Sequence, residues 1–264
     1  MHTIFEPGFF QSGPVHTALV VGAFTAVVSA VVGIFTVCRS QSFAGHALTD
    51  VATTGGSAAA YGGFAPLAGF LVGSATGAGA MEAIGLQRVR SRDLATGIVL
   101  GAATGLSALF LFLQSTSTAT TGVTQQILFG SIFEFDAGLL PAVVICAVGA
   151  LVAIALVQRP LLLSSLSPDL ASAQGVRVRF VGVVFLIALA VSVALSSLVV
   201  GSILSTALLI GPAATALRLT KTVGRAFVVA GALGIAATWL GILFAYDSAD
   251  WDPSSQGLPV SFFI

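Results

Sequence analysis

The stretch GLLPAVVICAVGALVAIALV, residues 138–157, is a run of twenty residues without a charged side chain. A helix needs about 20 predominantly apolar residues to cross the hydrocarbon core of a bilayer. A strand of a membrane barrel would instead show about 10 residues that alternate between apolar and polar. The run is too long and too continuously apolar for such a strand, so it predicts a membrane-spanning helix.

The composition of the whole chain agrees with this interpretation. Of its 264 residues, 56% are hydrophobic and only 8% are charged, and the mean hydropathy is +1.05. A typical soluble domain carries about 25% charged residues. Because helices satisfy the backbone hydrogen bonds of long apolar runs internally, the sequence predicts an all-α membrane protein, a polytopic bundle of about eight transmembrane helices.

Eight stretches have the length expected of membrane spans. Six are clearly apolar: 17–38, 64–84, 94–114, 138–157, 180–200 and 226–246. Two are weaker, because 42–61 is rich in small residues and carries His46 and Asp50, and 201–217 follows the preceding span almost without a loop. We expect these two to face other helices. The chain is predicted to form one domain, 1–264, with its helical bundle over 17–246.

The ten Lys and Arg residues test this count, because cytoplasmic loops are enriched in cations. With the N-terminus outside, every cation falls on the inner side: Arg39, then Arg88, Arg90 and Arg92, then Arg159, Arg177 and Arg179, then Arg218, Lys221 and Arg225. The outer side receives Glu6, Glu134, Asp136, Asp247, Asp250 and Asp252. A six-span arrangement breaks this separation, so we predict eight spans with both termini outside.

Several functional classes find no support in the sequence. The formal net charge is zero, so no basic field would recruit nucleic acid. No G-x-x-x-x-G-K-[ST] segment occurs, so this chain cannot hydrolyse ATP through a P-loop. The first residues lack the cationic segment of a cleavable signal peptide, which makes the first span permanent. No permanently bound cofactor is expected.

Glycine and other small residues recur at four-residue spacing in two spans. Gly69, Gly73 and Gly77 form one triplet, and Gly97, Gly101 and Gly105 form the other. This spacing places each triplet on one helix face, where small residues allow two backbones to approach closely. We therefore expect both triplets to pack against neighbouring helices.

The strongest candidate ligands are His46 and Asp50, which lie one helical turn apart in the weak span 42–61. A rise of 1.5 Å per residue from Ser42 places Asp50 about 12 Å deep, close to the middle of a ~30 Å hydrocarbon core. Imidazole and carboxylate suit Mn²⁺, Zn²⁺ or Fe²⁺. The alternative is structural, with the pair bonded to each other or to Thr49, Thr53 and Thr54; residue type and spacing alone favour neither.

Other ionisable residues are weaker candidates. Glu82, near the inner end of its span with Arg88 nearby, is better explained as a residue at the membrane interface or in a local ion pair than as a ligand. The acidic residues on the outer side could attract cations, although solvated loop charges are the simpler interpretation.

The longest inner connection, 160–179, contains a predicted short helix. Ser167 would cap its N-terminus, Pro168 would occupy the first helical position and Gly175 would end it. This segment is either a docking element for a cytosolic partner or an ordinary connecting loop.

Three segments together resemble the permease family of ABC importers for zinc, manganese and iron. The first is Arg39-Ser-Gln-Ser-Phe-Ala-Gly-His46-Ala-Leu-Thr-Asp50, similar to the family's Gly-Asp-x-x-x-His-Ala segment with the acid and the histidine exchanged. The second is Asp169-x-Ala171-x-x-x-Gly175-Val176, similar to the cytosolic loop that docks the ATPase. The third and most specific runs from Val200 to Ala216 and contains Ile-Gly-Pro-Ala-Ala.

This resemblance, which extends over residues 17–246, implies a function. The chain would be the permease subunit of an ATP-driven importer in a bacterial plasma membrane, carrying Mn, Zn or Fe. Its partners would be a cytosolic ATP-binding-cassette ATPase, an extracytoplasmic metal-binding protein and a second permease copy. His46 and Asp50 would contact the metal, and Pro168, Asp169, Ala171 and Gly175 would dock the ATPase. The rival is a stand-alone, proton-coupled metal transporter with Asp50 and Glu82 as its relay.

Overall fold

The computed structural model describes residue 9 and residues 12–84, 89–118, 121–130, 132–134, 137–248 and 258–264, and all regular structure in them is helical. The long helices are α1 (Gly13–Cys38), α2 (Ser42–Tyr61), α3 (Pro66–Ile84), α4 (Val89–Thr118), α6 (Leu140–Leu166), α8 (Val178–Val199), α9 (Ser202–Leu219) and α10 (Val223–Ser248). The short elements are α5 (Thr121–Phe129), α7 (Pro168–Ala173) and the 3-10 helices η2 (Ile132–Glu134), η3 (Ala137–Leu139) and η4 (Val260–Phe262).

Each predicted span coincides with one of the eight long helices of the described chain, which confirms the all-α polytopic fold. In the same residues, six helices are long and apolar enough to cross a membrane: α1, α4, α6, α8, α9 and α10. The span 64–84 is α3, in which glycines, Ser74, Thr76 and Glu82 lie among the apolar residues. The weaker span 201–217 is one of the six, as α9.

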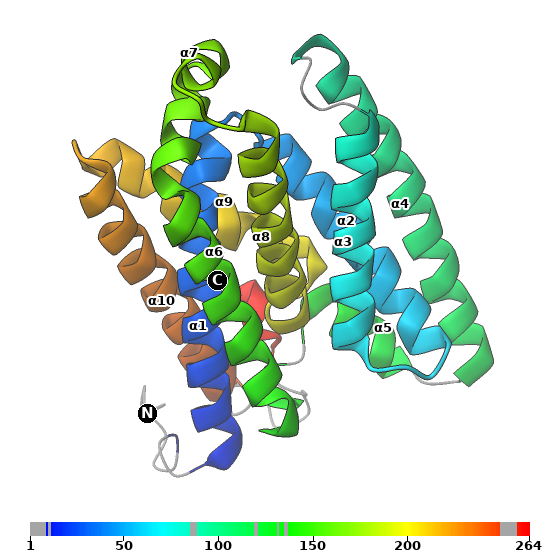
Figure 1. Ribbon diagram of the computed structural model, residues 1–264. Helices are drawn as coiled ribbons and strands as arrows, with labels where there is room; N and C mark the ends of the chain where they lie inside the picture. Colours follow the sequence, from blue (N-terminus) through cyan, green and yellow to red (C-terminus); the bar gives the residue numbers. More distant parts are fainter. Residues whose placement is uncertain are drawn as a thin grey trace.

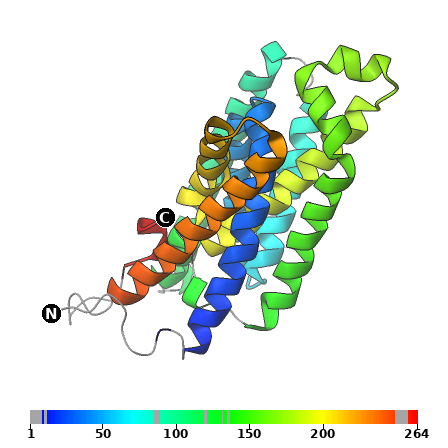
Figure 2. The same ribbon diagram turned by 90° about the vertical axis from the view of Figure 1, so that its left-hand side faces the viewer.

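The long helices form two groups joined by α8 (Figure 1). In one group α1 packs against α6, α9 and α10, and in the other α2 packs against both α3 and α4. The helix α8 contacts α1 and α6 as well as α2 and α3. Figure 2 shows α10 alongside α1 over much of its length. Side chains such as Phe35, Phe70 and Phe185 are buried within this bundle.

The outer surface of the bundle is also apolar. Leu156, Ile145 and Val228 leave 79%, 70% and 72% of their surface exposed on α6 and α10. In water such side chains would favour aggregation, whereas hydrocarbon is a good solvent for them. The fold is therefore that of a protein surrounded by lipid.

The first glycine triplet packs as predicted, and the second does not. A methyl group added at Gly73 would lie 2.7 Å from the carbonyl oxygen of Val51 and 2.9 Å from the Cα of Gly55, both on α2. An added methyl at Gly69 or Gly77 would also meet α2. At Gly97, Gly101 and Gly105 of α4, by contrast, an added methyl would meet no atom within 4 Å in the described chain. The packing prediction for the α4 triplet is therefore wrong within this chain.

Replacing Gly73 with Ala is expected to destabilise the protein, whereas Gly101→Ala should be neutral or stabilising. The methyl group at position 73 forces α2 away from α3, and overpacking of this kind destabilises by about 1–3 kcal/mol. At position 101 the methyl group enters open space, and Ala is favoured over Gly in a helix by about 1 kcal/mol. Thermal unfolding of both purified variants in detergent measures this; a midpoint for Gly73→Ala at or above that of Gly101→Ala would contradict the packing argument.

The helix ends and turns that carry several Arg and Lys residues lie at one end of the bundle, the upper end in Figure 1. Arg39 follows α1, Arg177 and Arg179 begin α8, and Arg218, Lys221 and Arg225 surround the turn between α9 and α10. Arg39 Nη1 donates to Ser164 Oγ of α6 at 3.0 Å, so the ends of α1 and α6 meet here. This grouping is what the charge pattern predicts for the cytoplasmic side. The side chains of Arg88, Arg90, Arg92, Glu6, Glu134, Asp136, Asp250 and Asp252 lie outside the described residues.

This end is predicted to face the cytoplasm, because inner loops are enriched in Lys and Arg. Both native cysteines are first replaced by Ser, and a single cysteine is then introduced at Gly13, which begins α1, or at Ser172 of α7. An impermeant thiol reagent should label Gly13→Cys, but not Ser172→Cys, in intact cells, and both after lysis. Labelling of Ser172→Cys alone in intact cells would reverse the orientation.

Candidate functional site

The candidate ligands His46 and Asp50 are placed by a tight turn between α1 and α2. Ser40 adopts a positive φ of 53°, and the backbone N–H of Gln41 donates to the carbonyl oxygen of Thr36 at 2.8 Å. The chain thus reverses direction within three residues, and α2 starts at Ser42 beside the end of α1. His46 lies in the second turn of α2 and Asp50 in the third.

The His46 imidazole contacts α9. Its Nδ1 lies 3.2 Å from Thr206 Oγ1, and Thr206 Oγ1 lies 3.4 Å from Thr49 Oγ1. Ser205 Oγ donates to Thr49 Oγ1 at 3.3 Å. Where His46 donates from Nδ1 to Thr206, its Nε2 carries a lone pair. Histidines that bind metals commonly have this arrangement, with one nitrogen on the ion and the other bonded to a neighbour.

The Asp50 carboxylate contacts α4. Thr104 Oγ1 donates to Asp50 Oδ2 at 2.8 Å. Behind the carboxylate, Ser107 Oγ donates to the carbonyl oxygen of Asp50 at 3.3 Å and lies 2.7 Å from Thr54 Oγ1. These contacts hold α2 against α4 through hydroxyl groups. They leave Asp50 half-buried, and no described hydrogen bond reaches the second oxygen of its carboxylate.

The described hydrogen bonds can be compared with the structural alternative, in which His46 and Asp50 bond to each other or to Thr49, Thr53 and Thr54. No hydrogen bond joins His46 to Asp50 among the interactions described for this chain, and the hydroxyls of Thr49, Thr53 and Thr54 donate to carbonyl oxygens one turn earlier in α2. The threonines that contact the two side chains are Thr206 and Thr104, from other helices. The imidazole and the carboxylate are thus positioned separately on the same helix.

The described part of one chain offers an incomplete coordination shell. Within the residues the structure covers, no group of three or more His, Cys, Asp and Glu side chains could hold a metal ion. His46 is exposed and Asp50 half-exposed at the surface of the chain, so other ligands can reach them from outside. A divalent ion at this point would complete its shell with hydroxyls, water or groups of another molecule.

The start of α9 is fixed by a close approach of two glycines. Gly201, at φ 92°, precedes α9, and Gly130, at φ 84°, follows α5. A methyl group on Gly130 would lie 2.7 Å from the carbonyl carbon of Val200, and one on Gly201 would lie 2.6 Å from the backbone nitrogen of Gly130. Only residues without a Cβ allow this crossing. It positions Thr206, in the second turn of α9, next to His46.

Glu82 lies apart from this site. Its Oε1 accepts a hydrogen bond from Arg179 Nε at 3.3 Å, at the end of the bundle where the cations gather. The partner that the sequence suggests for Glu82, the nearby Arg88, lies outside the described residues, and the described ion pair is with Arg179, 97 residues away.

The predicted helix in 160–179 is present as α7, at the top of Figure 1. Ser167 Oγ accepts from the backbone N–H of Leu170 at 3.3 Å, Pro168 occupies the first turn, and Gly175 ends the segment at φ 80°. Ala171 is fully buried where α7 packs on α6 and α8, whereas Asp169 and Gly175 are exposed. The helix therefore presents one face to the solvent side.

Sequence reasoning missed four residues. Thr104 and Thr206 contact the candidate ligands, and Leu166 and Leu170 expose 86% and 54% of their surface beside α7. Thr206 was within reach, because it lies inside the motif Val200 to Ala216. The others carry no local signal, since a threonine in a membrane span is common and so is a leucine in a helix.

The chain is similar to known membrane transport proteins along nearly its whole length. The profile of the ABC 3 transport family matches residues 12–256. A manganese transport system membrane protein, MntC of Listeria innocua, is 32% identical over 248 residues, 92% of this chain and 85% of MntC. A probable iron transport system membrane protein of Haemophilus influenzae is 29% identical over 254 residues, 92% of this chain and 88% of its own. Among solved structures, PsaBC from Streptococcus pneumoniae in complex with Fab shares the fold at a TM-score of 0.81 and 23% identity, over 97% of this chain and 88% of that one.

Proposed function

The chain belongs to the ABC 3 transport family as one of its membrane permeases, and we propose that His46 and Asp50 form its path for a divalent transition-metal ion. The carrying observation is that α2 presents an imidazole and a carboxylate one turn apart, each fixed by a threonine from another helix. The relatives named for manganese and iron support Mn²⁺ or Fe²⁺ as the cargo. Zn²⁺ is supported by ligand chemistry only.

The energetic reason for such a pair is the dehydration of the ion. A divalent cation that leaves water must find replacement oxygen or nitrogen atoms, because burying an unpaired charge in hydrocarbon is prohibitive. The carboxylate supplies charge and the imidazole supplies a donor that favours transition metals over Mg²⁺ and Ca²⁺. Two protein ligands per chain hold the ion weakly enough for release.

A second permease copy would complete the path. His46 and Asp50 reach the surface of one chain, and a twofold axis beside them would bring four ligands together. The glycines Gly101 and Gly105 of α4, which meet nothing in this chain, flank Thr104 and would let a second copy approach closely. These observations support a homodimer without defining its axis.

The remaining partners follow from the family and from α7. A permease without a P-loop of its own needs a cytosolic ATPase, and an importer needs an extracytoplasmic protein that delivers the ion. We propose that Pro168, Asp169, Ala171 and Gly175 form the ATPase-docking element, joined by the exposed side chains of Leu166 and Leu170.

The whole chain acts as a single permease domain in a bacterial plasma membrane. It crosses the membrane several times, with both termini outside. A stand-alone proton-coupled transporter would not need an ATPase-docking element such as α7.

Thr104→Val is expected to raise the KM for metal uptake about fivefold, because it removes the hydroxyl that orients Asp50. A fivefold change corresponds to ~1 kcal/mol, the size of one hydrogen bond at a partly exposed site. Thr104→Ser keeps the hydroxyl and should restore the original KM. Uptake of radioactive manganese by cells measures both. Equal KM values for Val and Ser would show that Thr104 does not position the carboxylate.

Docking is expected to depend on the exposed face of α7. Leu170→Glu should reduce stimulation of the ATPase at least several-fold, because it places a charge in an apolar contact, and Gly175→Leu should do the same by straining a residue at positive φ. The control Leu258→Glu changes an exposed leucine near the C-terminus, next to the end of α10. ATPase activity of the reconstituted complex reports docking, and the thermal midpoint of the permease reports folding. Normal stimulation in both α7 variants would rule out this docking site.

Transport is expected to require both His46 and Asp50. Asp50→Asn removes the charge and His46→Ala removes the nitrogen donor, so each should abolish metal uptake while the complex still assembles. The double variant His46→Asp with Asp50→His restores the order usual in the family and should retain more uptake than either single exchange. If every variant takes up metal at the original rate, the pair is structural.

A further inference from the structure

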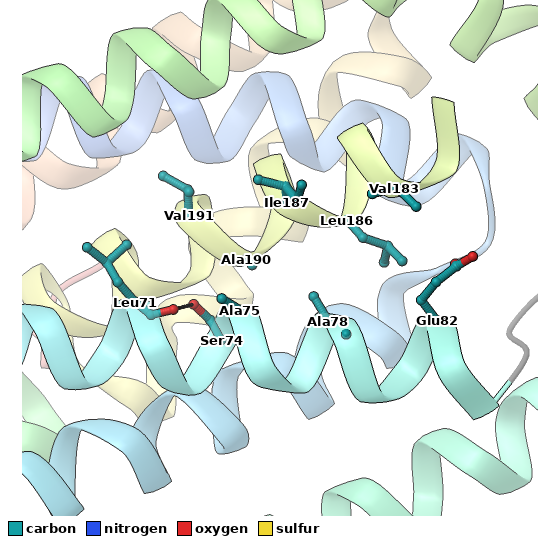
Figure 3. Close-up of a pocket in the computed structure, with 11 residues that line it drawn as sticks. Leu71, Ser74, Ala75, Ala78, Glu82, Val183, Leu186, Ile187, Ala190 and Val191 are labelled. Carbon is teal, nitrogen blue, oxygen red and sulfur yellow. Dashed lines mark hydrogen bonds between the residues drawn. The ribbon is translucent and has the colours of Figure 1, made fainter. Parts of the chain in front are cut away.

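An apolar groove between α3 and α8 lies away from the candidate ion path. Its volume is about 330 Å³, and it is lined along α3 from Leu71 to Glu82 and along α8 from Val183 to Val191. Figure 3 shows the labelled side chains of the two helices facing each other across it. Small ligand pockets have volumes of about 300–1,000 Å³, so this groove has room for one narrow ligand.

The lining selects an apolar ligand with a polar end. The only hydroxyl in the described lining belongs to Ser74, which already donates to the carbonyl oxygen of Leu71 at 3.1 Å (Figure 3). Glu82 is the only charged residue of the lining and lies at the cationic end of the bundle. A ligand in the groove would therefore find hydrocarbon along its length and charge at one end.

The groove opens toward the surroundings of the bundle, which are lipid. Ala75 and Gly79 of α3 are exposed, and Ile187 of α8 exposes 56% of its surface. The eleven-residue step from Leu71 to Glu82 spans about 16 Å at 1.5 Å per residue. One leaflet of a ~30 Å hydrocarbon core is about 15 Å thick. The length of the groove therefore matches the depth to which one acyl chain reaches.

The polar end is cationic and accessible. Arg179 uses Nε to bind Glu82, and 79% of its side chain is exposed. Arg177, two residues earlier, is also exposed. Glu82 opposes an anion, but it is paired with Arg179, and together with Arg177 these three described residues carry one net positive charge. A guanidinium binds a phosphate through paired hydrogen bonds, and basic sites between helices on this side of a membrane recognise anionic headgroups.

We propose that this groove binds one acyl chain of an anionic phospholipid, with the headgroup phosphate held by Arg179 and Arg177. The lipid would fill the space between α3 and α8 and so connect the two helix groups, since α8 is the helix that joins them. The site is separate from the ion path, because none of the residues that line the groove forms a described hydrogen bond with His46 or Asp50.

The test uses the full-length permease in phosphatidylcholine vesicles that contain a trace of a photoreactive lipid, with no metal present. The probe carries a diazirine in its acyl chain and has either a phosphatidylglycerol or a phosphatidylcholine headgroup. After illumination, mass spectrometry of the peptides locates the label. We expect the phosphatidylglycerol probe to label α3 and α8 at least fivefold more than the phosphatidylcholine probe.

Two pairs of variants separate the groove from the headgroup site. Gly79→Leu fills the groove, since a methyl group at Gly79 meets no atom within 4 Å, and Gly149→Leu places the same side chain on the equally open surface of α6. The first should reduce labelling of α3 and α8 by both probes several-fold, and the second should not. Arg179→Gln should abolish the preference for phosphatidylglycerol, whereas Arg225→Gln, at the α9–α10 turn, should keep it.

The outcomes that overturn the proposal are distinct. Labelling of α3 and α8 no stronger than that of the exposed face of α10 would mean ordinary contact with bulk lipid. Unchanged labelling in Gly79→Leu, or in Ala75→Leu should the first variant fail to fold, would exclude the groove. An unchanged headgroup preference in Arg179→Gln would exclude the phosphate site. Loss of labelling when partner proteins are added would show that a protein helix occupies the groove. Because no metal is present, failure of the proposed ion path leaves these results unaffected.

Discussion

The close contact between α2 and α3 is the constraint on which the candidate site depends. Glycines on both helices let the backbones approach so closely that a single methyl group at Gly73 would collide with α2. In lipid there is little hydrophobic force to hold helices together, so fit between their surfaces has to do so. With α3 on one side and α4 on the other, α2 has little freedom to shift or rotate. His46 and Asp50 lie on α2, so their backbone positions are constrained in the same way.

Hydroxyl groups then set the direction of each candidate ligand. Thr206 of α9 holds the imidazole and Thr104 of α4 holds the carboxylate, so one pair of side chains on α2 connects three helices. A hydroxyl serves this purpose well within a membrane, because it bonds to a charged or polar neighbour without adding a charge that needs its own compensation. The same contacts would couple a movement of α9 or α4 to the geometry around the ion, which is what a permease that alternates between two states requires.

Apart from Asp50, the charged residues of the described helices lie toward the ends of the bundle, because placing a charge in hydrocarbon is costly. Arg39 is bonded to Ser164, and Arg179 to Glu82, so the cations also join helices where they emerge from the apolar core. Away from these ends, the described helices expose apolar side chains such as Leu156 and Val228 to the lipid. The Asp50 carboxylate is the exception, and its position next to hydroxyls on a surface that other molecules can reach fits a role in passing a cation.

The sequence by itself determined the eight long helices, the separation of charge, the capped helix α7 and the candidate pair on α2, because each follows from the length of an apolar run, the sign of a charge or a local spacing. Only the tertiary structure decided what those residues contact. It packed Gly73 against α2 but left Gly101 open, although both belong to identical patterns, and it brought Thr104 and Thr206 to Asp50 and His46 from helices 54 and 160 residues away. Periodicity identifies a face of a helix, but the partner of that face is chosen by the packing of the whole bundle.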